Sequence, residues 1–327
     1  MKKFILNPSR LQGQGLGVIM GHLATAYCIS KSLNRKPVLH LDALDNTLFS
    51  LQQTQEDHPG YSEQKQNLLD TFPNISKHFH IEKEIPSIAK PDNSSMIKFN
   101  NLCDTQQIAD FFKTVTPRTD RWRNTKGKNK TLSIDAYSNR YCFEHDLDFL
   151  RDELFVFNDK ILKKTKPYVE AGGENSIAVS LRLEYHITHK KNKPLPAKLY
   201  HTPLSPRYYS LALERFDQAK FPRGATAFVF CDYPNESSNF IDEISFANGT
   251  MALMGNKFNA SELLCIFSHC KHAVLSNSAF AFWGAALNKN KRAKIICPTN
   301  YMSGESDQFN PVNGRWYLPE WEALEQV

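Results

Sequence analysis

The sequence contains no long hydrophobic run and no closely spaced pair of cysteines. No stretch approaches the ~18 apolar residues that a membrane-spanning helix needs, and the apolar run near Met1 is too short for a secretory signal. The seven cysteines are scattered and none forms a CxxC pair, which favours neither a zinc cluster nor a disulfide framework. We therefore expect a soluble, cytoplasmic protein whose thiols are buried in a reducing environment.

A strong excess of one charge is also absent. The net charge is +6, a mildly basic balance that favours anionic partners without selecting one. Much of the excess lies in residues 118–130 and 189–198. Two solvated loops are the simpler interpretation, and a surface that rests on an anionic membrane is the alternative. Neither stretch lies in a nucleic-acid-binding module, so no nucleic-acid partner is expected.

The first 42 residues show the pattern of a strand, a glycine-rich turn, a helix and a second strand. The turn contains Gly15 and Gly17, His22 begins the helical pattern "HLATAYCISKSLNR", and the second strand ends at Asp42. Such a unit is the start of a parallel α/β sheet. Residues 46–135 are polar and irregular, with no clear repeat.

The region 173–300 alternates between strand and helix patterns. The predicted strands are 176–183, 225–232, 272–278 and 293–298, and the predicted helices are 207–221, 259–271 and 279–290. This alternation predicts a doubly wound, mostly parallel sheet. In such sheets ligands bind just beyond the carboxyl ends of the strands.

The stretch "HAVLSNSAFAFWGAALN" places three small polar residues, Ser276, Asn277 and Ser278, between an apolar strand and an apolar helix. Free backbone N–H groups and small hydroxyls at a strand end suit a phosphate or a sugar hydroxyl. An ordinary helix N-cap is the simpler alternative, because Ser and Asn are favoured there.

Three separated blocks together resemble the α-1,2-fucosyltransferases of glycosyltransferase family 11. Residues 13–42 contain a turn similar to the family's Gly-Gly-Leu-Gly-Asn-Gln-Met, and "VSLRLEY" at 179–185 stands in place of its His-x-Arg-Arg-x-Asp-Tyr motif. Residues 260–298 are the nearest match. The resemblance covers both ends and the second half of the chain well, and residues 46–170 poorly.

The resemblance implies a GT-B-like α/β fold, with two Rossmann-type domains whose mostly parallel sheets face each other across a cleft. We expect residues 1–172 to form the N-terminal, acceptor-side domain and residues 173–300 the nucleotide-sugar donor domain. Residues 301–327 would form a tail that packs back toward the N-terminal domain.

The implied reaction is an inverting transfer of L-fucose from GDP-fucose, without a metal or another cofactor. "DLD" at 146–148 is similar to a metal-binding DxD motif, but it lies in a helical pattern and is interpreted as surface acid.

Several residues match positions of the family's donor site. Arg182 matches the first arginine of the motif and, by the resemblance, binds the donor diphosphate, a role that suits a guanidinium. Asp232 would hold guanine or ribose. Ser276–Ser278 and Phe280 would line the donor pocket. The structural alternatives are a surface ion pair for Arg182 and a helix cap for Asp232.

The sequence also departs from the family pattern. Ser180 and Leu183 replace the motif's histidine and second arginine. Val18-Ile19 replaces the Asn-Gln pair of the turn, and Tyr233 replaces a second acid after Asp232. An unusual donor or acceptor, or partial loss of donor contacts, would account for these differences.

Three residues are candidates for the base that takes the proton of the acceptor hydroxyl. Glu184 is the first candidate, and His22 and Asp42 are the next two. Gly15 and Gly17 belong to the same acceptor-side turn as His22.

Three other functions remain open. A nicotinamide or flavin enzyme would use the glycine-rich turn and Asp42 as a dinucleotide fingerprint, but Val18 or Met20 stands where its third glycine is needed. A binding or scaffold protein that has lost turnover would bind nucleotide without transfer. A GT-B transferase with another nucleotide sugar would be identified by a donor screen.

The function expected from these observations is a cytoplasmic, metal-independent transfer of fucose to a galactose hydroxyl in α-1,2 linkage. The acceptor would be a surface-glycan oligosaccharide, such as an O-antigen of lipopolysaccharide, carried on a lipid. The protein would then contact the inner face of the membrane peripherally, through its basic loops.

Overall fold

The computed structural model describes residues 3–6, 11, 15–41, 68–82, 96–98, 131–135, 140–183, 204–216, 221, 224–255, 257–299 and 317–325. The chain divides into two compact units, residues 1–49 with 65–158 and residues 50–64 with 159–327. Two residues of the predicted site, Asp42 and Glu184, lie outside the described residues.

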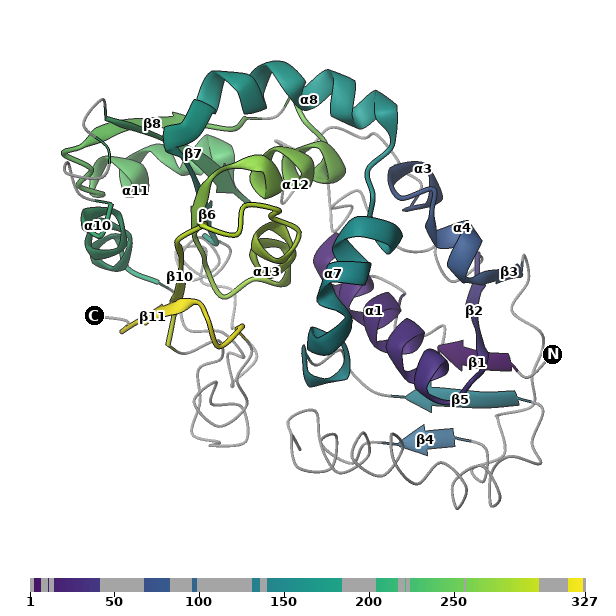
Figure 1. Ribbon diagram of the computed structural model, residues 1–327. Helices are drawn as coiled ribbons and strands as arrows, with labels where there is room; N and C mark the ends of the chain where they lie inside the picture. Colours follow the sequence, from purple (N-terminus) through teal and green to yellow (C-terminus); the bar gives the residue numbers. More distant parts are fainter. Residues whose placement is uncertain are drawn as a thin grey trace. The chain divides into compact units, whose positions relative to one another are not determined.

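The first unit is built on a five-stranded sheet in the order β3-β2-β1-β5-β4, and all of its strand pairs are parallel (Figure 1). The strands are β1 (Lys3–Leu6), β2 (Lys36–His40), β3 (His80–Glu82), β4 (Met96–Lys98) and β5 (Thr131–Asp135). The helices are α1 (Leu16–Ser32), α3 (Leu68–Thr71), α4 (Ile75–His78) and α7 (Leu147–Phe149), which continues as a π-helix over Leu150–Leu154. The predicted strand, helix and second strand are confirmed as β1, α1 and β2. The helix begins earlier than predicted, at Leu16, so Gly17 lies in the helix and not in the glycine-rich turn.

Helix α1 ends at Ser32, and the chain turns at Asn34. Asn34 has a φ of 51°, a left-handed conformation that asparagine tolerates better than most residues. The N–H of Arg35 donates to the carbonyl of Ser30, and the N–H of Asn34 donates to the carbonyl of Lys31. This pair of bonds satisfies carbonyls that the helix end would otherwise leave open.

The second unit is built on a six-stranded parallel sheet in the order β11-β10-β9-β6-β7-β8. The strands are β6 (Ser176–Leu181), β7 (Ala225–Cys231), β8 (Gly249–Leu253), β9 (His272–Val274), β10 (Ile295–Pro298) and β11 (Glu322–Leu324). The helices are α8 (Asp159–Gly172), α10 (Pro206–Glu214), α11 (Ser238–Asp242), α12 (Ala260–His269) and α13 (Ala279–Ala286). Counted from β8, the strands stand in the order 3-2-1-4-5-6, which is that of a Rossmann fold.

The predicted doubly wound sheet is thereby confirmed, and β8 and β11 are strands that the sequence analysis missed. Both lie at edges of the sheet. Neither strand is buried along its length, and β11 has only three residues. A short, half-exposed edge strand lacks the continuous apolar run that marks a buried one.

Strand β6 is buried over its whole length because neighbouring strands and helices cover it on all sides. Its alternate residues Ile177, Val179 and Leu181 join a core with Tyr208 and Tyr209 of α10. On the opposite face, α12 packs against α13 and over β7, and Phe267 of α12 contacts the ring of Phe230 at 4.9 Å between centroids.

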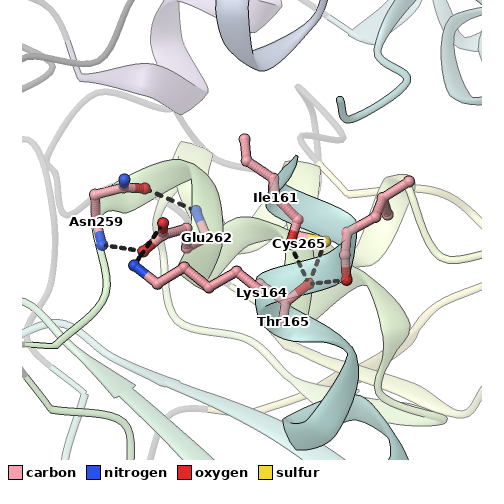
Figure 2. Close-up of polar contacts among 7 residues, drawn as sticks. Ile161, Lys164, Thr165, Asn259, Glu262 and Cys265 are labelled. Carbon is pink, nitrogen blue, oxygen red and sulfur yellow. Dashed lines mark hydrogen bonds and ion pairs between the residues drawn. The ribbon is translucent and has the colours of Figure 1, made fainter. Parts of the chain in front are cut away.

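Helix α12 begins with a capping box that also holds helix α8 (Figure 2). The side chain of Asn259 accepts from the N–H of Glu262, and the carboxylate of Glu262 accepts from the N–H of Asn259. Both oxygens of that carboxylate lie 2.8 Å from the ammonium group of Lys164 in α8. One turn further, the hydroxyl of Thr165 lies 3.2 Å from the Cys265 sulfur.

These contacts place α8 in the second unit. The predicted boundary after Gly172 therefore lies one helix later than the division of the chain at Asn158–Asp159. In the predicted tail, the described residues 317–325 contain β11, which pairs with β10. The packing of this tail toward the N-terminal domain stays a prediction.

Six of the seven cysteines fall among the described residues, and all six are buried free thiols: Cys28, Cys142, Cys231, Cys265, Cys270 and Cys297. Burial raises the pKa of the Cys265 thiol to about 11 and that of Cys297 to about 12. Buried thiols were expected from the sequence, and the structure confirms them for these six.

Candidate functional site

The carboxyl ends of three neighbouring strands, β6, β7 and β9, bring together most of the predicted donor-site residues. Arg182 follows β6, Asp232 follows β7, and Ser276–Ser278 follow β9. The next strand along the chain, β7, lies on one side of β6, and β9 lies on the other side. The point between β6 and β9 is therefore the topological switch point, where open parallel sheets bind their ligands.

Arg182 crosses this switch point. Its Nη1 donates to the carbonyl oxygen of Asn277 at 3.2 Å, and its side chain is half-buried. This bond joins the segment after β6 to the segment after β9 and fixes one end of the guanidinium. The sequence also allowed a surface ion pair between Arg182 and a carboxylate, but the acceptor of this Nη1 bond is a backbone carbonyl.

Asp232 joins the segment after β6 to the end of β7. Its Oδ1 accepts from the backbone N–H of Leu183 at 2.7 Å. Asp232 is not a helix cap in this arrangement, since the short helix that follows begins at Pro234 with Tyr233 in the cap position. The carboxylate stands at the edge where the sequence analysis expected a donor contact.

Ser276 faces inward. It is completely buried, and its Oγ lies 2.8 Å from the Oγ of Ser180 on β6. Its carbonyl accepts from the N–H of Ser278 at 2.8 Å and from the hydroxyl of Tyr317 at 3.2 Å. The geometry thus gives Ser276 a structural position behind the strand-end edge, whereas the expectation was that it lines a pocket.

Ser278 occupies the N-cap position of α13, as the simpler alternative anticipated. Its side chain makes no capping hydrogen bond, however, and the helix contains no acidic residue in its first turn. Phe280, in that turn, packs against Phe267 with 6.2 Å between ring centroids. Donor contacts by Ser278 and Phe280 stay predictions.

Three tyrosines hold the same edge, and sequence reasoning missed all of them. Tyr208 donates from its hydroxyl to the carbonyl of Leu275 at 2.9 Å, and Tyr317 donates to Ser276. Tyr209 lies beside Tyr208 with its ring at 79° and 5.1 Å. Burial raises the pKa of Tyr208 and of Tyr209 well above the usual value, and for Tyr209 a hydrogen bond from the Arg182 backbone acts weakly in the opposite direction. Both phenols are therefore neutral.

No sequence signal identified these tyrosines as site residues. Tyr208 and Tyr209 stand in an amphipathic helix, where aromatic residues usually form core. Tyr317 lies 39 residues beyond Ser278 along the chain, and only the tertiary structure brings its hydroxyl to the turn.

The first unit holds the remaining predicted residues. Gly15 is exposed at the N-cap of α1, and Gly17 and His22 are buried inside that helix. His22 is only 1% exposed, which argues against it as the base that meets an acceptor. Asp42 and Glu184, the other candidate bases, are not placed.

Within the described part of the chain, no group of three or more His, Cys, Asp or Glu side chains is arranged to hold a metal ion. The metal-independent reaction stays a prediction. Of the helices that the structure describes, none has the length and apolar character needed to cross a membrane.

Part of the chain matches a glycosyltransferase family in sequence, and nearly the whole chain is similar to a known transferase. Residues 206–325 match the family model of glycosyl transferase family 11. An α-1,2-colitosyltransferase of Escherichia coli is 24% identical over 323 residues, which cover 94% of this chain and 97% of the relative.

Among solved structures, POFUT1 in complex with GDP aligns with a TM-score of 0.51 at 11% identity, over 90% of this chain and 98% of POFUT1. The fucosyltransferase NodZ from Bradyrhizobium aligns at 14% identity and a TM-score of 0.49, over 87% and 92%. The fold is the GT-B-like α/β type that the resemblance predicted, with two Rossmann-type units built on parallel sheets. The chain is a glycosyltransferase, and its residues 206–325 match family 11.

Proposed function

We propose that this protein transfers L-fucose from GDP-fucose to a galactose hydroxyl of an oligosaccharide, in α-1,2 linkage, with inversion and without a metal. The observation that carries the proposal is the position of Arg182. Its guanidinium stands at the switch point of a Rossmann unit, anchored to the carbonyl of Asn277. In this fold the switch point is where a nucleotide binds.

The charge of Arg182 suits the leaving group. As the bond between the anomeric carbon and the phosphate oxygen breaks, negative charge grows on the diphosphate of GDP. A positioned guanidinium stabilises that charge with two parallel hydrogen bonds, which a lysine cannot do. One end of Arg182 is already held by Asn277, so less side-chain freedom is lost when the donor binds.

Asp232 is proposed to hold the nucleoside. Its Oδ1 is fixed by the N–H of Leu183, and a carboxylate at this edge can accept from a ribose hydroxyl or from guanine N–H groups. This contact would select the nucleotide, while Arg182 acts on its diphosphate.

Inverting transfer needs in-line attack by the acceptor hydroxyl and a base for its proton. The acceptor oxygen forms its bond to the anomeric carbon, the proton moves to a carboxylate, and GDP leaves with the electron pair of the broken bond. Glu184 is the proposed base, because it follows directly on Leu183, whose backbone is held at the strand edge by Asp232.

We base the proposed acceptor and the proposed cellular location on the distribution of basic residues. The basic stretches 118–130 and 189–198 suit a peripheral contact with an anionic membrane. A lipid-linked surface-glycan oligosaccharide at the inner face of a bacterial membrane is the acceptor that fits such a contact.

Calorimetric titration of the full chain with GDP, in the presence of a chelator, tests the donor site. UDP, CMP and NAD serve as comparison ligands. We expect selective GDP binding that weakens roughly 10- to 100-fold in Arg182→Ala, because a hydrogen bond to a charged group contributes about 1.5–3 kcal/mol. Arg292→Ala, which changes an exposed arginine of the same unit, is the matched control and should bind GDP normally. Binding of UDP alone, or equal binding by Arg182→Ala, would contradict the proposal.

A colitosyl donor is the second candidate. It is favoured by the Escherichia coli relative, which matches nearly the whole chain and is named an α-1,2-colitosyltransferase. Assays with GDP-fucose and GDP-colitose, on the same galactose-terminated acceptor, distinguish the two. A turnover preference for the colitosyl donor would keep the nucleotide site and change the sugar.

A further inference from the structure

We propose that Tyr317 is a positioning residue for donor binding, which holds the guanidinium of Arg182 in place through the turn that follows β9. The inference rests on the proposed role of Arg182. It concerns a tyrosine near the C-terminal end of the sequence, far along the chain from both Arg182 and the turn.

Three consecutive carbonyl groups of this turn each accept a hydrogen bond from a different segment. The carbonyl of Leu275 accepts from Tyr208 at 2.9 Å, and that of Ser276 accepts from Tyr317 at 3.2 Å. The carbonyl of Asn277 accepts from Arg182 at 3.2 Å. The donors come from α10, from the segment before β11 and from the end of β6.

These bonds fix the orientation of three successive peptide planes. Since each peptide unit is planar, fixing the Ser276 carbonyl also fixes the N–H of Asn277, and it restricts the direction of the next carbonyl. That next carbonyl is the one that anchors Arg182. A rotation of the turn at Ser276 would therefore move or break the Arg182 anchor.

Burial makes this arrangement stiff. Ser276 is fully buried and Tyr317 is only 7% exposed. Water has little access to replace a bond that is lost there, so each buried polar group depends on its protein partner. The hydroxyl of Ser276 adds a second anchor through Ser180, at 2.8 Å.

The hydroxyl of Tyr317 can be separated from its ring. The ring packs near Trp321, with 6.2 Å between centroids, and a phenylalanine keeps that contact. Only the hydroxyl reaches the Ser276 carbonyl. Tyr317→Phe therefore removes the hydrogen bond to the turn and leaves the apolar packing of this segment in place.

The test is a double-mutant cycle on GDP binding, measured by calorimetry on the full chain. In the otherwise unchanged protein, Tyr317→Phe should weaken GDP binding about three- to tenfold, the value of one buried hydrogen bond. In an Arg182→Ala background it should have no effect on GDP binding. A general loss of structure would instead weaken binding equally in both backgrounds.

Thr165→Val is the matched control. It removes a buried hydroxyl that bonds the Ile161 carbonyl and Cys265 in the same unit, away from the turn (Figure 2). Its melting temperature should fall about as much as that of Tyr317→Phe, with GDP affinity unchanged. Ser180→Ala removes the other hydrogen bond to Ser276. It should weaken GDP binding in the otherwise unchanged protein and have no effect in the Arg182→Ala background, and it replaces Tyr317→Phe in the test if that variant folds poorly.

The outcomes separate the two proposals. If Arg182→Ala weakens GDP binding and Tyr317→Phe does not, the positioning role is wrong and the proposed function stands. Equal losses in both backgrounds also overturn the positioning role, because the turn would then act independently of Arg182. If Arg182→Ala binds GDP normally, the proposed function itself fails, together with the inference that rests on it.

Discussion

The two units arrange their first three strands alike and differ in the chemistry beside the first of them. In each, the first strand lies inside the sheet, β1 between β2 and β5 and β6 between β7 and β9. Beyond β6 stand Arg182 and the bonds that tie it to both neighbouring strand ends. At the start of α1, by contrast, Gly15 provides no capping side chain, and the first turn has no acidic residue. Among the described residues, polar side chains that join neighbouring strand ends in this way are found in the second unit.

The buried hydroxyl groups differ in the same way. Thr25 in α1 is 1% exposed, and its Oγ1 has no hydrogen-bond partner among the residues that the structure describes. Thr165 in α8 is equally buried and bonds the Ile161 and Leu162 carbonyls as well as Cys265. Of these two buried hydroxyls, the one in the second unit is paired and the one in the first unit has no partner among the described residues, a difference that can be tested.

The largest expected effect comes from adding a methyl group at one glycine of each unit. A Cβ on Gly284 would meet ring atoms of Phe267 at 2.4 Å, and that ring is held between Phe230 and Phe280. Overpacking of about 1–3 kcal/mol should outweigh the ~1 kcal/mol gain in helix propensity. Gly284→Ala should therefore lower the free energy of unfolding by up to about 2 kcal/mol, measured by urea denaturation.

Gly15→Ala is the counterpart in the first unit. A Cβ there meets no atom within 4 Å, and its φ of −72° suits any residue. The free energy of unfolding should change by less than about 0.5 kcal/mol. An equal loss in the free energy of unfolding of Gly284→Ala and Gly15→Ala would contradict the difference in packing around the two glycines. A loss of transfer with normal stability in Gly15→Ala would support its predicted acceptor-side role.

A smaller effect is expected from exchanging the two threonines for valine. Thr165→Val should cost about 1 kcal/mol because it removes satisfied buried hydrogen bonds. Thr25→Val should leave the free energy of unfolding unchanged or raise it, since it replaces a buried hydroxyl without a described partner by a methyl group. Thermal unfolding monitored by circular dichroism provides both values. Similar losses at the two positions would contradict the difference in polar pairing.

Buried thiols occur in both units, and the two units should respond alike to a rise in pH. The loss of stability expected from a single thiol is the smallest of these effects. Burial raises the pKa of Cys265 to about 11 and also raises the pKa of Cys28 in the first unit. The folded state therefore keeps these thiols neutral above pH 9, where the unfolded chain ionises them. Stability should be complete below pH 9 and fall as the pH rises from 9 toward 11, by less than about 1 kcal/mol from Cys265 at pH 9.5.

Urea unfolding at pH 7.5 and pH 9.5 measures the summed loss from the buried thiols. Cys265→Ala should lose less stability between the two values, and the difference gives the share of Cys265. The same burial predicts that iodoacetamide modifies the thiols of both units slowly at pH 8 unless urea is added. Rapid labelling of Cys28 in the native protein would show that the interior of the first unit opens more readily than that of the second.

The sequence by itself determined most of the inner strands and the helices of the second unit, and it indicated the strand ends where the candidate site residues lie. The alternation of apolar strands with helices predicted a doubly wound sheet, and the helical pattern of 259–271 predicted α12. Arg182, Asp232 and Ser276–Ser278 were expected at strand ends, and parallel pairing places such ends at one edge. These features depend on short-range patterns, which a single sequence carries.

Only the tertiary structure decided which of those side chains face the edge and what holds them. Ser276 turns inward to Ser180, Arg182 bonds the Asn277 carbonyl, and Tyr317 reaches the turn from far along the chain. The assignment of α8 to the second unit likewise depends on Lys164 meeting Glu262. Strand order and side-chain direction follow from pairings between distant segments, and no local pattern of residues encodes them.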